Sequence, residues 1–163
     1  MKKKKLLKLL VIAIIFILFI FIFREIFIYK TIEEVLSGKI DEETEVKGII
    51  VSIGQNNWLK RKITPTIKDQ ETMTTILEGF RNMELKKLGN RSDIDRYDLD
   101  YSLQIIAKNQ VAEKHYSTET VHLFFDENYL DVNGVPYEII SESHHTDVIE
   151  EILNNDEIEW DEY

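Results

Sequence analysis

The sequence predicts an α+β fold: a single N-terminal transmembrane helix, then a small, mainly antiparallel β-sheet with about two packed helices. An apolar run fills Leu6–Phe23, broken only by Lys8. Several later segments alternate polar and apolar residues with period two, as strands do, and two others repeat apolar residues at helical spacing. Strands and helices do not alternate regularly, which favours helices on one face of an antiparallel sheet.

The N-terminal run is predicted to span a membrane. At about 1.5 Å per residue it would make roughly 27 Å of helix, close to the apolar thickness of a bilayer. The alternative is a cleaved signal peptide, but no Ala, Gly or Ser follows the run in Arg24–Phe27. The lysines of Lys2–Lys5 precede the run, so the positive-inside rule predicts a cytoplasmic N-terminus and an extracytoplasmic domain, hence a single-pass protein of the cell membrane.

Three segments carry the clearest strand patterns. Their apolar faces are Ile49, Val51 and Ile53; Tyr97, Leu99, Tyr101, Leu103 and Ile105; and Val121, Leu123 and Phe125. A less regular alternation covers residues 59–67, where Pro65 suggests a strand end or an edge. Asn133-Gly134 predicts a two-residue hairpin, because both residues tolerate positive φ, and Pro136 suggests that this hairpin has an edge.

Two helices are expected beside the strands. The first is capped by Asp69, and its apolar face is Met73, Ile76, Leu77 and Phe80. The second is capped by Thr146, and its apolar face is Val148, Ile149, Ile152 and Leu153. Thr31, Glu34 and Gly38 also favour a short helix that ends at the glycine. The predicted organisation is an anchor at 1–30, a linker at 31–44, the domain at 45–155 and a flexible acidic tail at 156–163.

Charge is distributed unevenly along the chain. The 163 residues carry a formal net charge of −10, yet residues 1–30 hold seven Lys or Arg and one acid. After Lys114 there are 14 Asp or Glu and no Lys or Arg. Such a field repels nucleic acid, so we expect no nucleic-acid partner. The acidic half could bind cations or a small ligand, or it could be a solvated surface that keeps the domain soluble.

Composition and motifs exclude most catalytic classes. The absence of cysteine excludes disulfides, thiol nucleophiles and Cys-ligated metal sites. No Walker loop, Gly-x-Ser-x-Gly, Gly-x-Gly-x-x-Gly or His-Glu-x-x-His occurs. We therefore predict a protein that is not an enzyme and assign no catalytic, cofactor-binding or metal-ligating residues and no cofactor. A carboxylate pair in an envelope hydrolase stays an alternative, because any two of the many acids could meet in space.

A zinc site is one interpretation of the histidine-rich segment. Glu142, His144, His145 and Asp147 offer imidazole and carboxylate, but adjacent histidines on an extended segment point to opposite sides. A solvated loop before a helix explains the same residues, and His122 is expected on the surface or facing a helix.

Two short motifs allow a binding or a modification role. Residues 58–62 form a basic patch with a tryptophan, which fits either an acidic partner or a solvated strand flank. Residues 90–92 match the N-glycosylation sequon, which matters only in a eukaryotic secretory pathway.

Four segments carry a loose family resemblance: Ile67–Glu71, the following helix to Phe80, Met83–Lys87 and Tyr137–Ile139. Over about residues 45–155 the chain resembles small uncharacterised membrane-anchored proteins or lipoproteins of low-GC Gram-positive bacteria. The resemblance implies a bacterial cell-surface setting and a domain of unknown function, and it brings no catalytic residues.

Together these observations predict a single-pass, membrane-anchored extracytoplasmic binding or accessory protein that is not an enzyme. Its expected partners are the lipid bilayer, through the N-terminal helix, and a protein or envelope component, through the outward domain. A cation- or small-ligand-binding domain is the alternative, and an envelope hydrolase is a third class.

Overall fold

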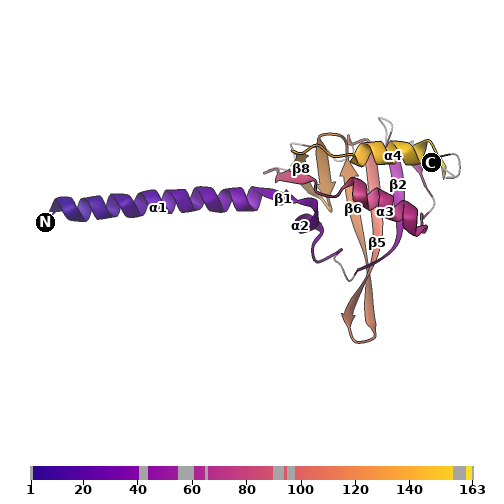
Figure 1. Ribbon diagram of the computed structural model, residues 1–163, viewed down its shortest axis with the longest axis horizontal. Coiled ribbons are helices and arrows are strands. Elements are labelled where there is room, and N and C mark those ends of the chain that lie inside the picture. Colours follow the sequence, from indigo (N-terminus) through magenta and orange to yellow (C-terminus); the bar gives the residue numbers. More distant parts are fainter. Residues whose placement is uncertain are drawn as a thin grey trace.

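A single antiparallel sheet with helices on one face forms the body of the protein (Figure 1). The computed structural model describes residues 2–40, 44–54, 61–64, 66–89, 94, 98–155 and 161–162. In chain order the elements are α1 (Lys2–Ile28), β1 (Tyr29–Thr31), α2 (Ile32–Leu36), β2 (Glu45–Gly54), β3 (Arg61–Ile63), α3 (Gln70–Gly79), β4 (Glu84–Lys87), β5 (Tyr101–Ala112), β6 (His115–Phe125), β7 (Tyr129–Val132), β8 (Val135–Ile139), α4 (His145–Leu153) and β9 (Asp161–Glu162). The nine strands lie in the order β1-β4-β8-β7-β6-β5-β2-β3-β9. The predicted α+β class with a mainly antiparallel sheet is confirmed.

The N-terminal helix corrects one prediction. Helix α1 extends away from the sheet, and its described apolar side chains, Leu10–Ile20, are exposed (Figure 1). No helix in the described part of the chain is long and apolar enough to cross a membrane. The predicted transmembrane helix is therefore unsupported, and the predicted single-pass localisation, with a cytoplasmic N-terminus and an extracytoplasmic domain, is contradicted.

The centre of the sheet follows the predicted alternation. Strand β5 pairs with β6 and β2, so Leu103 lies between Leu123 and Val51. These three side chains are buried on the face that α3 and α4 cover. The pattern predicted from residue 97 becomes regular strand only at Tyr101, after a bend through residues 98–100.

Both helices pack on this face. Asp69 caps α3 as predicted, accepting from the backbone N of Thr72 at 2.8 Å. Helix α4 begins two residues earlier than predicted, so Thr146 lies inside the helix and His144 occupies the N-cap position. A Cβ built on Gly79 of α3 would lie 3.0 Å from Val148 Cγ2 of α4, so the two helices are in close contact there.

The β7–β8 hairpin turns at Asn133 and Gly134, with φ values of 51° and 85°, as predicted. The predicted edge at Pro136 is wrong, because β8 lies between β7 and β4. The carbonyl of Pro136 accepts from the backbone N of Leu88 at 3.0 Å, just beyond the end of β4. Where β4 ends, the missing N–H of a proline removes no ladder hydrogen bond.

Several predictions concern the flanks of the sheet. The predicted short helix near residue 31 is α2, and Thr31 and Glu34 form its capping box. The tail predicted as flexible contains β9, which pairs with β3. Residues 55–60 and 90–93 lie outside the described residues, so most of the basic patch and the glycosylation sequon are not placed.

Candidate functional site

The histidine-rich segment does not assemble a metal site. His144 is exposed, and its Nδ1 lies 3.0 Å from Asp147 Oδ2. His145 is only 1% exposed and points into the core, so the two imidazoles lie apart. The reason differs from the predicted one, because His144 and His145 lie at the N-terminus of α4 and not on an extended segment. No group of three or more His, Cys, Asp or Glu among the described residues is placed to hold a metal ion.

The His145 ring joins α4 to the β6–β7 turn. Its Nε2 lies 2.8 Å from the carbonyl oxygen of Asp126, which can only accept, so Nε2 carries the proton. Its Nδ1, 2.8 Å from Ser143 Oγ, is then the acceptor in the neutral ring. Phe80 and Phe125 pack against the ring at centroid distances of 5.5 and 5.4 Å. Burial lowers the pKa of His145, partly offset by the hydrogen bond to Asp126, so burial favours the neutral ring and the residue belongs to the core.

Among the residues that the structure describes, the acids do not converge on one metal-binding group. Burial raises the pKa of Asp100, and repulsion from Asp126 and Glu127 adds to the effect. The Oδ1 of Asp126 is already occupied by the backbone N–H groups of Asn128 and Tyr129, at 2.7 and 2.8 Å. Asp100, Asp126 and Glu127 therefore fit a solvated acidic surface better than a set of ligands for a bound ion.

A second acidic region lies between the two helices. The open hollow between α3 and α4 has a volume of about 810 Å³, and its lining contains the acids Asp69, Glu71 and Glu151. Hydrogen bonds from Thr72 hold the pKa of Asp69 below its usual value, since this carboxylate caps α3. A helix cap already explains Asp69, and Glu71 lies in the first turn of the helix, where negative charge is favoured. This region likewise gives no support to cation binding.

The distinctive surface of the molecule is the far end of the β5–β6 hairpin, which projects beyond the sheet (Figure 1). Strand β2 pairs with β5 only as far as Lys108, and β7 pairs with β6 only from Leu123 onward. Between these limits the two strands pair with each other, through Asn109–Ser117 and Gln110–Tyr116. We call residues 109–120 the β5–β6 arm.

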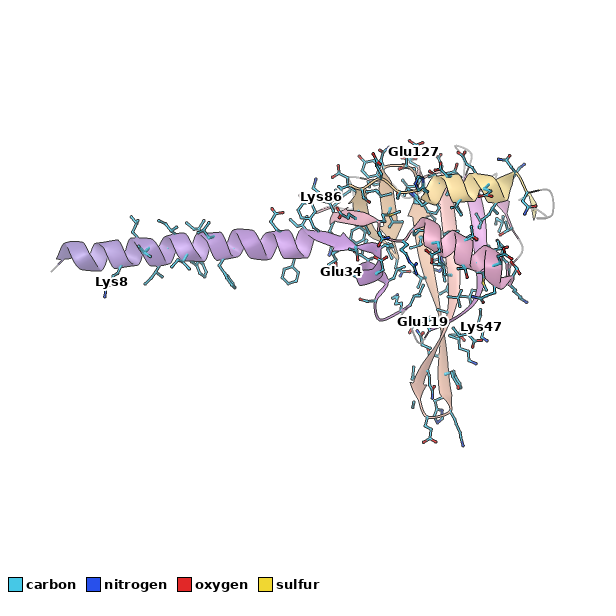
Figure 2. All side chains as sticks on the ribbon, in the orientation of Figure 1. Lys8, Glu34, Lys47, Lys86, Glu119 and Glu127 are labelled. Atoms are coloured by element: carbon cyan, nitrogen blue, oxygen red, sulfur yellow. The ribbon has the colours of Figure 1, made fainter. Side chains whose placement is uncertain are left out.

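The base of the arm is fixed to the domain. Asn109 Oδ1 accepts from Thr44 Oγ1 at 2.7 Å, and Asn109 Nδ2 donates to the carbonyl of Lys39 at 3.0 Å. Glu45 contacts Lys47 and lies 3.9 Å from Lys108, and the hydrogen bond from Lys47 holds the pKa of Glu45 below its usual value. Figure 2 shows Glu119 and Lys47 near this base. The Asn109 side chain thus joins the arm to both Lys39 and Thr44 of the preceding segment.

The far part of the arm exposes large apolar side chains. Val111 and Tyr116 are 65% and 57% exposed. The Nζ of Lys108 lies 4.1 Å from the centroid of the Tyr116 ring, a cation–π contact that orients the ring. A β-bulge between Gln110 and Ala112 increases the local twist, and Lys114 turns the chain with φ of 62°. The arrangement presents an oriented aromatic ring at a distance from the domain.

Sequence reasoning missed the arm, because it ended one strand at Ile105 and began the next at Val121. The interval between them mixes polar and apolar residues without a sustained apolar face. Two signals could have found it: the aromatic and β-branched residues Tyr116, Thr118 and Thr120 at period two, and the short Glu113-Lys114 connection.

The chain matches no family model, no curated protein and no solved structure. The resemblance to small surface proteins of low-GC Gram-positive bacteria therefore stays a prediction. The geometry of the arm is the strongest indication of a function in the described part of the chain.

Proposed function

We propose that this protein is a non-enzymatic binding or accessory protein, and that its β5–β6 arm contacts a partner protein. The observation that carries the proposal is the exposure of Val111 and Tyr116 on a ribbon fixed at its base. Tyrosine is among the residues that contribute most to binding energy, because it buries a large, rigid surface with few rotatable bonds.

The construction of the arm supports this role. A two-stranded ribbon alone is marginally stable in water. The hydrogen bonds of Asn109 at the base and the contact between Lys108 and Tyr116 reduce the number of conformations that binding must remove. Such preorganisation lowers the entropic cost of association.

The charge of the arm indicates the chemistry of the partner. The chain as a whole is acidic, but the arm and its base carry Lys108 and Lys114 against Glu113 and Glu119. A balanced surface of this kind attracts neither a polyanion nor a polycation strongly. The partner that fits is a protein surface with an apolar pocket for the tyrosine and the valine.

Photocross-linking tests the proposal. A photoreactive phenylalanine analogue replaces Tyr116 in the full chain in its source cells, and the same analogue at Tyr129, which is 37% exposed, is the matched control. We expect position 116 to give a cross-linked adduct with another protein, and position 129 to give no adduct of the same mass. An adduct of twice the chain mass of 19.3 kDa is scored separately. Equal adducts from both positions, or no heterologous adduct from position 116, would contradict the proposal.

A further inference from the structure

The outer edge of β6 along the arm is an open ladder of backbone groups. The backbone N of Asn133 donates to the carbonyl of His122 at 2.9 Å, and the backbone N of His122 donates to Asn133 Oδ1 at 3.0 Å. The peptide groups of His122 therefore point toward β7. Because peptide groups alternate sides along a strand, those of Thr120, Thr118 and Tyr116 point the same way. In the described part of the chain, no strand pairs with them there.

This edge lacks the usual protection against pairing. Natural edge strands are short, or they carry lysine or proline. The sheet's own edges, β1 and β9, have three and two residues. The arm segment from His115 to Thr120 has aromatic and β-branched residues, no proline, glycine or lysine, and one carboxylate, on Glu119. Such an edge favours the addition of another strand.

We propose that the added strand is β6 of a second copy of this chain, antiparallel to the first and related to it by a two-fold axis at Ser117. In this register His115 lies opposite Glu119 of the second copy, and the symmetry produces the pair twice. These are non-hydrogen-bonded positions, where opposing side chains are closest, so a contact between the imidazole of His115 and the carboxylate of Glu119 favours this register. An axis at Glu119 would instead place two carboxylates face to face.

The length of the arm fits the same register. With the axis at Ser117, Thr120 of one copy lies opposite Lys114 of the other, so the overlap ends at the turn of each arm. The antiparallel direction places the second domain beyond the tip of the first arm, which keeps the two bodies apart. Pairing occupies the backbone edge and leaves Val111 and the ring of Tyr116 on other surfaces of the ribbon. The dimer therefore goes beyond the proposed function and would present two binding arms.

Cysteine cross-linking tests the register, because the chain has no cysteine of its own. Ser117→Cys places two thiols at a non-hydrogen-bonded pair, where Cα atoms about 4.5 Å apart suit a disulfide. Thr118→Cys and Gln110→Cys, also on the arm, are the matched controls. The full chain is kept in solution with a mild nonionic detergent, because α1 exposes apolar side chains, and a thiol oxidant is added.

We expect Ser117→Cys to form a disulfide-linked dimer at least tenfold faster than either control. Equal rates, or a faster Thr118→Cys, would overturn the register. Association through α1 does not predict this difference between neighbouring positions on the arm. The photocross-linking detects a different protein that contacts the side chain at position 116, whereas the disulfide detects pairing between the β6 edges of two copies. The partner proposal and the dimer proposal can therefore fail separately.

A charge exchange supplies a second test. Adding His115→Glu to the Ser117→Cys chain places two carboxylates opposite each other at both ends of the ladder, and we expect cross-linking to slow at least fivefold. Adding Glu119→His to that chain restores the pair with its charges exchanged, and the rate should recover. A rate that stays low after the second change would refute the pairing of residues 115 and 119.

Discussion

Replacing His145 with alanine should lower the free energy of unfolding by about 4 kcal/mol. The side chain is 1% exposed and makes two hydrogen bonds of 2.8 Å, to Ser143 and to the carbonyl of Asp126. Losing them costs about 1 kcal/mol each. Removing a buried ring packed against Phe80 and Phe125 adds about 2 kcal/mol through lost contacts and a cavity.

Urea unfolding of the full chain, followed by near-ultraviolet circular dichroism in a mild nonionic detergent, measures this loss. The matched control is His144→Ala, since His144 is the exposed neighbour whose contact with Asp147 contributes at most about 1 kcal/mol. If the two variants lost the same free energy of unfolding, the assignment of His145 as a stabilising core residue would be refuted.

The same residue makes the stability of the protein depend on pH. Burial lowers the pKa of His145 below its ordinary value of 6.5, so the folded protein resists protonation of the ring. The stability from the neutral ring is fully present above pH 6.5 and is lost as the pH falls toward the lowered pKa. Between pH 7.0 and 5.5, His145→Ala should therefore lose less stability than the unmodified protein. An equal loss in both would contradict this reasoning.

Three further substitutions test the helix cap, the hairpin turn and the helix contact. Asp69→Ala should lower the melting temperature at pH 7. The pKa of Asp69 is lowered in the fold, so the difference in melting temperature between the variant and the unmodified protein should shrink as the pH falls below about 3.8 and protonation removes the capping charge. Gly134→Ala should cost roughly 1 kcal/mol in urea unfolding, since φ is +85° there, whereas Gly89→Ala, which meets no atom within 4 Å, should cost less. Gly79→Val should push against Val148 and destabilise the protein by about 1–3 kcal/mol. The substitution should also speed amide hydrogen exchange more in α4 than in the arm.

Local signals predicted the central part of the fold. The alternation that includes Leu103 and Leu123 is visible because one face of these strands is buried and the other is not. The turn at Asn133 was predictable from its chemistry alone. By contrast, β1 and β4 have three and four residues, too few to show a period, and their pairing depends on distant segments.

The candidate site was not predictable in the same way. Both faces of the arm are exposed beyond its base, so no burial pattern marks it, and Val111 and Tyr116 are separated by a turn with no glycine or proline. The histidines drew attention as ligands because their residue types suit a metal. Only the packing of His145 against Phe125 shows that one of them belongs to the core.

The order of strands in the sheet has a consequence for synthesis on the ribosome. Strand β1 pairs with β4, and β4 pairs with β8, which ends at Ile139. The early strand must therefore wait for most of the chain to emerge before the sheet beside it is complete. The β5–β6 hairpin has neighbouring partners and can close first, since local contacts form quickly. A nascent chain interrupted before Val135 would lack β8 and leave the apolar side of β4, centred on Leu85, open to proteases and chaperones.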